Sequence, residues 1–277
     1  MNIEYNKKRE IIISCILNKK IPDLFYKFSI KWYNLKKELD KYIDKLCFMF
    51  NIKKIDTVEC KNIGSRNSYF DFILTINKFK FKIEFKFNTD NIKNTPQFVS
   101  PAKPSIFLYS SYEEFYYEKY LKHLCKEYNF EIPNKKIYIQ QINNNKPKCI
   151  VKLQQKYYNG CKNSSKFTNI KEDILFYNEC KTLSKESIIS FISNNELDME
   201  KLSKYLINTQ KDKIYMLYKN GSIVLETVDK DEYIIEKYTK HPKENRFVLY
   251  TKNNKQIKIL LRWKNGNGIA FPAFQIS

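Results

Sequence analysis

The chain has 277 residues, of which 43% are hydrophobic, so it can bury a sizeable core and is not a disordered tail. Its 50 Lys and Arg against 30 Asp and Glu give a net charge of +20. Such a charge attracts polyanions, which makes nucleic acid the first partner to consider. An AT-rich genome is the alternative source of the lysines, since its codons favour Lys, Asn, Ile, Tyr and Phe. That bias does not explain why acidic residues are fewer.

The cysteines and the apolar runs bear on compartment. Seven cysteines are scattered without C-x-x-C spacing, and there are only two His, which argues against structural zinc and for a reducing, intracellular compartment. The run Ile11–Leu17 follows basic residues but is short and lacks a cleavage site, so it predicts an amphipathic helix and not a signal peptide. No apolar stretch approaches the ~20 residues of a membrane helix, so no membrane partner is expected. The composition points to a low-GC genome, with a viral one as a candidate.

Residues 22–50 are predicted to form one long helix, because apolar residues recur there at three- and four-residue spacing. This stripe is predicted to pack in the core, and it comprises Phe28, Trp32, Leu35, Leu39, Ile43, Leu46 and Phe50. A polar loop at 61–68 follows. Residues 69–77 and 79–87 then alternate apolar and polar side chains, which predicts two strands.

The rest of the chain predicts a mixture of helices and strands. After a loop at 88–104, the predicted elements are a strand at 105–109, a helix at about 112–128 and a strand at 136–142. Further predicted helices lie near 170–180, 185–194 and 197–208, and predicted strands lie at 213–218, 222–228, 246–250 and 256–263, with 268–277 pairing back. Ser184 is a candidate N-cap for the helix at 185–194.

These elements predict an α/β (α+β) fold, in which the first strands and helices are followed by a helical section and a β-rich C-terminal region. The polar segment 143–147 is a plausible boundary. We therefore expect a first domain at 1–145 and a second region at 146–277, which either forms its own domain or packs onto the first.

The predicted hairpin at 69–87 brings acidic residues together. A turn at 77–78 places Phe72 opposite Ile83, and it places Asp71 opposite Glu84 on the other face, with Cβ atoms ~5 Å apart. Lys86 lies two residues further along that face. Two carboxylates this close repel each other unless a cation lies between them, and their oxygens suit Mg²⁺. A neighbouring Lys can orient or deprotonate water, or offset charge on a phosphate.

Asp71 followed by Glu84-Phe85-Lys86 resembles the D…(D/E)-x-K signature of the PD-(D/E)XK, or restriction-endonuclease-like, nucleases. The resemblance covers about 25–142, where the predicted helix, hairpin and strand–helix–strand are similar to the family's core. It implies a restriction-endonuclease-like core, which is a mixed sheet flanked by helices. Phe70 stands where the family often has Pro. The resemblance implies that Asp71, Glu84 and the Phe85 carbonyl bind Mg²⁺, or Mn²⁺ in its place. It also implies that Lys86 acts on the attacking water and that the products carry 5′-phosphate and 3′-hydroxyl ends.

Other readings of these residues stay open. E-x-K occurs three times in the chain, although only the second lies in a predicted strand opposite an Asp. The charged face of the hairpin could also simply contact water. Glu59 and Gln97 are weaker candidates for the same site.

Several polar and basic residues are candidates for binding nucleic acid, because Arg and Lys contact phosphate or guanine and Asn reads adenine. They are Arg66 in the loop before the hairpin, and Arg262, Lys264, Asn265 and Asn267 in a Gly-rich C-terminal segment. That segment is equally well explained as an ordinary hairpin turn. We therefore expect a Mg²⁺-dependent DNA endonuclease that could act as a homodimer. Residues 1–145 are expected to form its nuclease core, and 146–277 are expected to help bind DNA. The alternatives are a non-catalytic nucleic-acid-binding module and a basic packaging protein.

Overall fold

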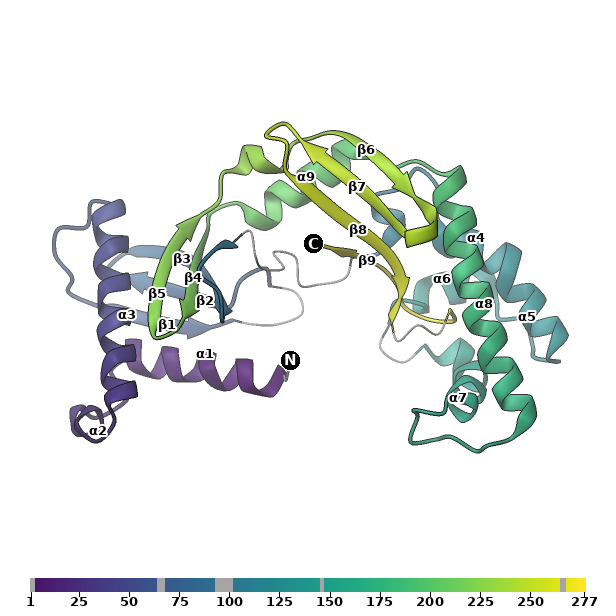
Figure 1. Cartoon of the computed structure of the whole chain (residues 1–277), viewed down its shortest axis with the longest axis horizontal. Helices are drawn as coiled ribbons and strands as arrows, with labels where there is room; N and C mark the ends of the chain where they lie inside the picture. The colour runs from purple at the N-terminus through teal and green to yellow at the C-terminus, as the bar shows by residue number, and fades with distance from the viewer. Residues whose placement is uncertain (1–2, 64–67, 93–101, 145–146, 265–267) are drawn as a thin grey trace. The chain divides into compact units, whose positions relative to one another are not determined.

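The computed structural model of the chain describes residues 3–63, 68–92, 102–144, 147–264 and 268–277. It confirms the predicted mixed α/β class, and Figure 1 shows the elements. The chain forms two compact units, one of Met1–Gln97 with Ile207–Lys230 and the other of Phe98–Leu206 with Asp231–Ser277. No helix among the described residues is long and apolar enough to cross a membrane.

The first unit contains a five-stranded sheet in the order β1-β2-β3-β4-β5. Its strands are β1 (Val58–Asn62), β2 (Phe72–Ile76), β3 (Phe79–Phe87), β4 (Lys213–Lys219) and β5 (Ser222–Thr227). Neighbouring strands are antiparallel except β3 and β4, which are parallel. The predicted 213–228 hairpin is confirmed as β4 and β5. The strand β1 was not predicted, because it overlaps the expected polar loop.

The parallel pairing of β3 with β4 explains why the units divide the chain differently from the expected boundary near 145. Parallel strands need a long crossover connection. Here the crossover runs over 88–212 and contains most of the second unit's helices. Backbone hydrogen bonding to β3 therefore makes 213–219 part of the first unit. Changes in composition along the chain do not reveal such a long-range pairing, so the expected boundary missed it.

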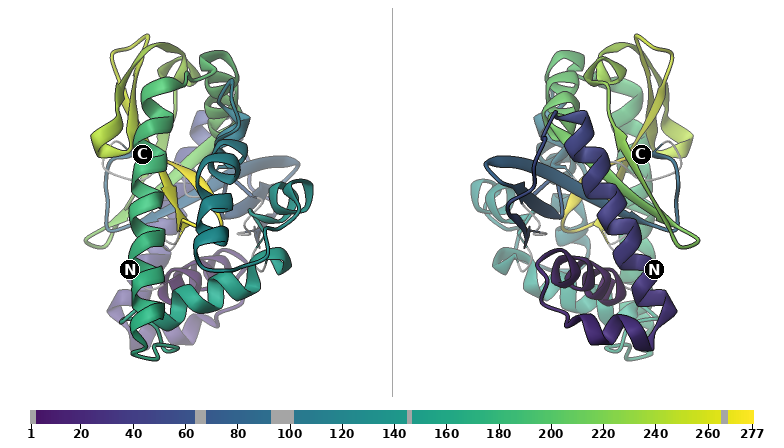
Figure 2. Two further views of the ribbon diagram at one scale, coloured as in Figure 1. Left: turned by 90° about the vertical axis from the view of Figure 1, so that its right-hand side faces the viewer. Right: turned by 90° about the vertical axis from the view of Figure 1, so that its left-hand side faces the viewer.

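Helices α1 (Ile3–Leu17) and α3 (Ile30–Met49) cover one face of this sheet, as the right-hand view of Figure 2 shows. Their apolar residues share a core cluster with the inward side chains of β1–β5. The prediction of a single helix at 22–50 is wrong, because extended backbone at Ser29 separates α3 from α2 (Asp23–Phe28). Leu39 and Leu46 in the middle of the predicted stripe are buried, whereas Phe28 at its start is 80% exposed.

The second unit contains most of the remaining helices. They are η2 (Pro104–Ile106), α4 (Tyr112–Tyr116), the π-helical η3 (Tyr117–Leu121), α5 (Lys122–Glu127), α6 (Lys135–Gln141), η4 (Lys148–Ile150), α7 (Val151–Gly160), α8 (Lys171–Asn194), α9 (Met199–Gln210), η5 (Lys230–Tyr233) and η6 (Pro242–Glu244). The helix predicted at 112–128 is confirmed as the continuous α4–η3–α5 segment. Helix α9 crosses the boundary between the units.

Three local predictions in this unit are wrong. The segment expected as a strand at 105–109 begins in the 3-10 helix η2. The strand expected at 136–142 is helix α6, which Asn134 caps by accepting from the Ile137 amide, and which buries Tyr138 and Ile142 four residues apart. Ser184 is not an N-cap but a buried residue within α8, which is one unbroken helix in the left-hand view of Figure 2.

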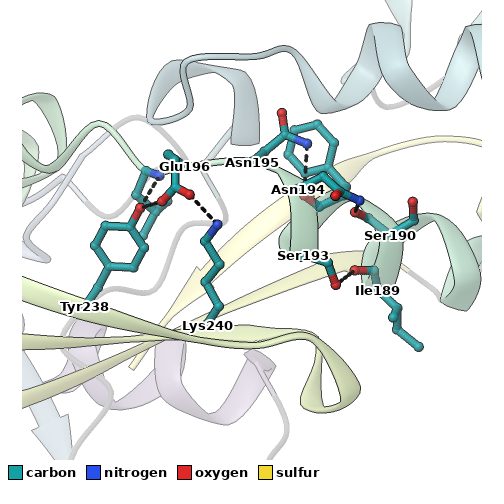
Figure 3. A network of polar contacts seen from close by, with 10 residues as sticks. Ile189, Ser190, Ser193, Asn194, Asn195, Glu196, Tyr238 and Lys240 are labelled. Carbon is teal, nitrogen blue, oxygen red and sulfur yellow. Dashed lines mark hydrogen bonds and ion pairs between the residues drawn. The ribbon is translucent and has the colours of Figure 1, made fainter.

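The C-terminal part of the second unit is a sheet in the order β6-β7-β8-β9. Its strands are β6 (Ile235–His241), β7 (Arg246–Thr251), β8 (Gln256–Trp263) and β9 (Pro272–Ile276). The predicted hairpin at 246–263 and the returning last strand are confirmed, and β6 is an addition. Figure 3 shows that Glu196, between α8 and α9, accepts from the Tyr238 hydroxyl and pairs with Lys240, which ties β6 to that turn.

Candidate metal and catalytic site

The β2–β3 hairpin forms in the predicted register. Phe72 lies opposite Ile83, and Leu74 lies opposite Phe81. The turn residue Asn77 has a φ of 53°, the left-handed conformation that a tight hairpin turn requires and that Asn tolerates. The apolar residues of both strands therefore face the core with α1 and α3, and the alternate residues face the other way.

Asp71 lies one residue before β2 and is anchored to β3 at two points. Its amide donates to the Ile83 carbonyl at 2.9 Å, and its Oδ2 accepts from the Phe85 amide at 2.8 Å. The backbone N–H and C=O of one strand residue point toward the same neighbouring strand. The Phe85 carbonyl therefore points to the Asp71 side of β3, beyond the last β2–β3 pair. This geometry places one carboxylate and one carbonyl oxygen on the same side.

Glu84 is held between two lysines. The Nζ of Lys86 lies 2.5 Å from Glu84 Oε1, and the Nζ of Lys213 lies 3.7 Å from Glu84 Oε2. The side chains of Glu84 and Lys213 are only 6% and 4% exposed, and that of Lys86 is 14% exposed. Lys213 is the first residue of β4 and reaches Glu84 because β4 runs parallel to β3. No motif in the sequence singled out Lys213.

Charges in this neighbourhood shift one another's protonation. Burial, and then the charge of Glu84, raise the pKa of Asp71 to about 7; Glu10 acts in the same direction, and Lys86 opposes it. Burial followed by the charge of Glu84 also raises the pKa of Glu10, which lies on α1. Burial lowers the pKa of Lys213, while Glu84 opposes this. Glu10 therefore joins the electrostatic environment of the site, although sequence reasoning missed it.

The oxygen donors at this position suit a hard divalent cation. No group of three or more His, Cys, Asp and Glu side chains within the described ranges could hold a metal ion. The candidate donors here are the carboxylates of Asp71 and Glu84 and the carbonyl of Phe85. Mg²⁺ is commonly bound by one or two carboxylates and keeps several of its waters. A cation here would also offset the charge of Glu84, which after burial is the second cause of the raised pKa of Asp71.

Glu59, the weaker acidic candidate, does not join this site. It lies in β1 opposite Thr75, which lies in turn opposite Lys80. Lys80 is four residues before Glu84 on β3, a separation of roughly 13 Å along the strand. Glu59 also has an exposed side chain, so it is a surface residue of the sheet.

The candidate nucleic-acid contacts are only partly described. Arg262 is an exposed residue of β8 in the second unit. Lys264 follows β8, is half-buried, and has its ammonium 4.7 Å from the centre of the Phe271 ring. Three further candidate contacts lie outside the described residues: Arg66, Asn265 and Asn267. Gln97, the other weaker candidate for the site at Asp71 and Glu84, also lies outside them.

Comparison of the chain with protein-family models, with curated proteins and with solved structures found no match. A functional conclusion therefore depends on the chemistry of the residues gathered around Asp71 and Glu84.

Proposed function

We propose that the chain is a Mg²⁺-dependent deoxyribonuclease that hydrolyses phosphodiester bonds as an endonuclease, like the restriction-endonuclease-like family that its hairpin resembles. The observation that carries this proposal is the hydrogen bond from the Phe85 amide to Asp71, which fixes one carboxylate beside the Glu84–Lys86 pair. Mn²⁺ is expected to substitute for Mg²⁺, because both accept carboxylate, carbonyl and water ligands.

Each residue has a defined part in this proposal. Asp71, Glu84 and the Phe85 carbonyl would hold the ion, which when bound supplies a Lewis acid and lowers the pKa of bound water. Lys86, the more exposed of the two lysines on Glu84, can donate to a water or to a phosphate oxygen. Its ammonium would thereby orient the attacking water or offset the charge that develops on the phosphate.

The order of elements in the first unit also supports the proposal, although not as expected from the sequence. Helix α3 precedes the β1–β3 strands, and α9 leads into β4, which is parallel to β3. The expected strand–helix–strand at 105–142 does not supply this part of the core, because it lies in the second unit and its last segment is helix α6. A similarity to the family's core would therefore rest on α3, β1–β4 and α9.

The charge distribution supports DNA as the partner. Lys and Arg outnumber Asp and Glu in both units, so the positive charge is not confined to one segment. Phosphate contacts by such residues provide sequence-independent affinity that weakens as salt rises. Cutting both strands of a duplex would need two such centres, so we expect the active form to be a homodimer.

A second candidate function is nucleic-acid binding without cleavage. One observation favours it: each carboxylate oxygen of Glu84 already faces a lysine ammonium. Such a pair of lysines neutralises the carboxylate without any metal ion. Under this alternative the site would serve stability alone.

A plasmid assay separates the two functions. The purified full chain is incubated with supercoiled plasmid in Mg²⁺, Mn²⁺ or EDTA, beside Asp71→Asn and Lys86→Met. Lys80→Met is the matched control, because it removes an exposed charge from β3 away from Glu84. We expect metal-dependent nicking or linearisation that falls by about 100-fold or more in Asp71→Asn and Lys86→Met and persists in the control. Gel retardation should be similar in all four proteins.

Retardation of the plasmid without cleavage in every metal would refute the nuclease and support the binding module. Cleavage that persists in Asp71→Asn would place the chemistry at another site. Discrete product bands would indicate sequence specificity, and a smear would indicate its absence.

A further inference from the structure

We propose that Lys213 occupies the position of a second metal ion at this centre, so that the centre binds a single divalent cation. The inference rests on the proposed function in one respect, which is that Glu84 serves as a metal ligand. It adds a positioning residue from β4 that the D…E-x-K motif does not contain.

The two oxygens of Glu84 are not equally available. In two-metal sites the ions lie about 3.5–4 Å apart, and a carboxylate that bridges them gives one oxygen to each. The ammonium of Lys213 faces Oε2 of Glu84. Its side chain is 4% exposed, so it cannot move into solvent without breaking the packing around β4. Lys86, at 14% exposure, is freer to release Oε1 to an ion.

Removing the charge of Lys213 would change metal affinity in opposite directions if the residue replaces a second ion or if it only supports the Glu84 side chain. A fixed ammonium stabilises the metal-free carboxylate and repels an incoming divalent cation. A neutral residue at 213 should therefore tighten the binding of one cation. If Lys213 only held Glu84 in its rotamer, its loss would loosen the ligand and weaken metal binding.

Titration of the full chain with Mn²⁺, with free Mn²⁺ followed by electron paramagnetic resonance, gives the stoichiometry and Kd without reference to activity. The variants are Lys213→Met and Lys213→Gln, which remove the charge, and Lys213→Arg, which keeps it. Lys82→Met is the matched control, because Lys82 lies opposite Lys213 in register but pairs with Asp212 instead. Asp71→Asn identifies the site, and circular dichroism checks that each variant is folded.

We expect one Mn²⁺ per wild-type chain, and a Kd lower by about 10-fold in Lys213→Met and Lys213→Gln. Lys213→Arg and Lys82→Met should bind like wild type. Two Mn²⁺ per wild-type chain, or unchanged or weaker binding in both neutral variants, would overturn the inference and leave the metal site intact. Absence of any Mn²⁺ binding that depends on Asp71 would overturn the proposed function, and this inference with it.

Discussion

Asp71→Asn is expected to stabilise the metal-free chain at neutral and alkaline pH, although it removes a proposed metal ligand. Burial, and then the charge of Glu84, raise the pKa of Asp71 from 3.8 to about 7. The folded chain thus holds this proton more tightly than the unfolded chain does. The stabilisation that the bound proton contributes is fully present below pH 3.8 and is lost as the pH rises to about 7. A tenfold difference in proton affinity is worth about 1.4 kcal/mol, so the contribution of this proton to the free energy of unfolding is at most about 4 kcal/mol.

The substitution should remove this loss, because an Asn amide is neutral and its oxygen can still accept from the Phe85 amide. Urea unfolding in EDTA from pH 4 to pH 8 measures the difference in unfolding free energy between Asp71→Asn and wild type. We expect the difference to be smallest at pH 4, to grow with pH and to level off above about 7. Asp56→Asn, which removes an exposed carboxylate of the same unit, controls for loss of one charge. A difference that does not change with pH would refute the reasoning.

Two matched pairs of substitutions test packing, with urea unfolding as the measurement. Tyr42→Phe removes a buried hydroxyl without a hydrogen-bond partner in the described part of the chain, so stability should hold or rise, whereas Tyr117→Phe removes a 2.7 Å bond to a backbone carbonyl and should cost about 1 kcal/mol. Gly160→Ala would place a Cβ atom 1.9 Å from the Asp173 carbonyl oxygen and should cost about 3 kcal/mol or more. Gly221→Ala, with a φ of +87° and open space around it, should cost about 1 kcal/mol. Equal losses within either pair would contradict these expectations.

The sequence by itself determined the local hairpins. Alternating side chains and a two-residue turn set the register of 69–87, because a slip of one residue would move every apolar side chain to the opposite face. That register predicted Asp71 beside the Glu84–Lys86 pair. In the structure Asp71 lies one residue outside β2, where its carboxylate accepts from the Phe85 amide. The hairpins at 213–227 and 246–263 were equally predictable for the same reason.

The tertiary structure alone decided which distant segments meet. Parallel pairing of β3 with β4 depends on a crossover of more than a hundred residues, and no local pattern names the partner strand. That pairing brings Lys213 to Glu84, and the packing of α1 on the sheet brings Glu10 into the same electrostatic environment. Local sequence also does not decide the structure of segment 136–142, because its apolar residues suit a strand or a helix. In the folded chain the segment is helical, and Tyr138 and Ile142, four residues apart, are both buried.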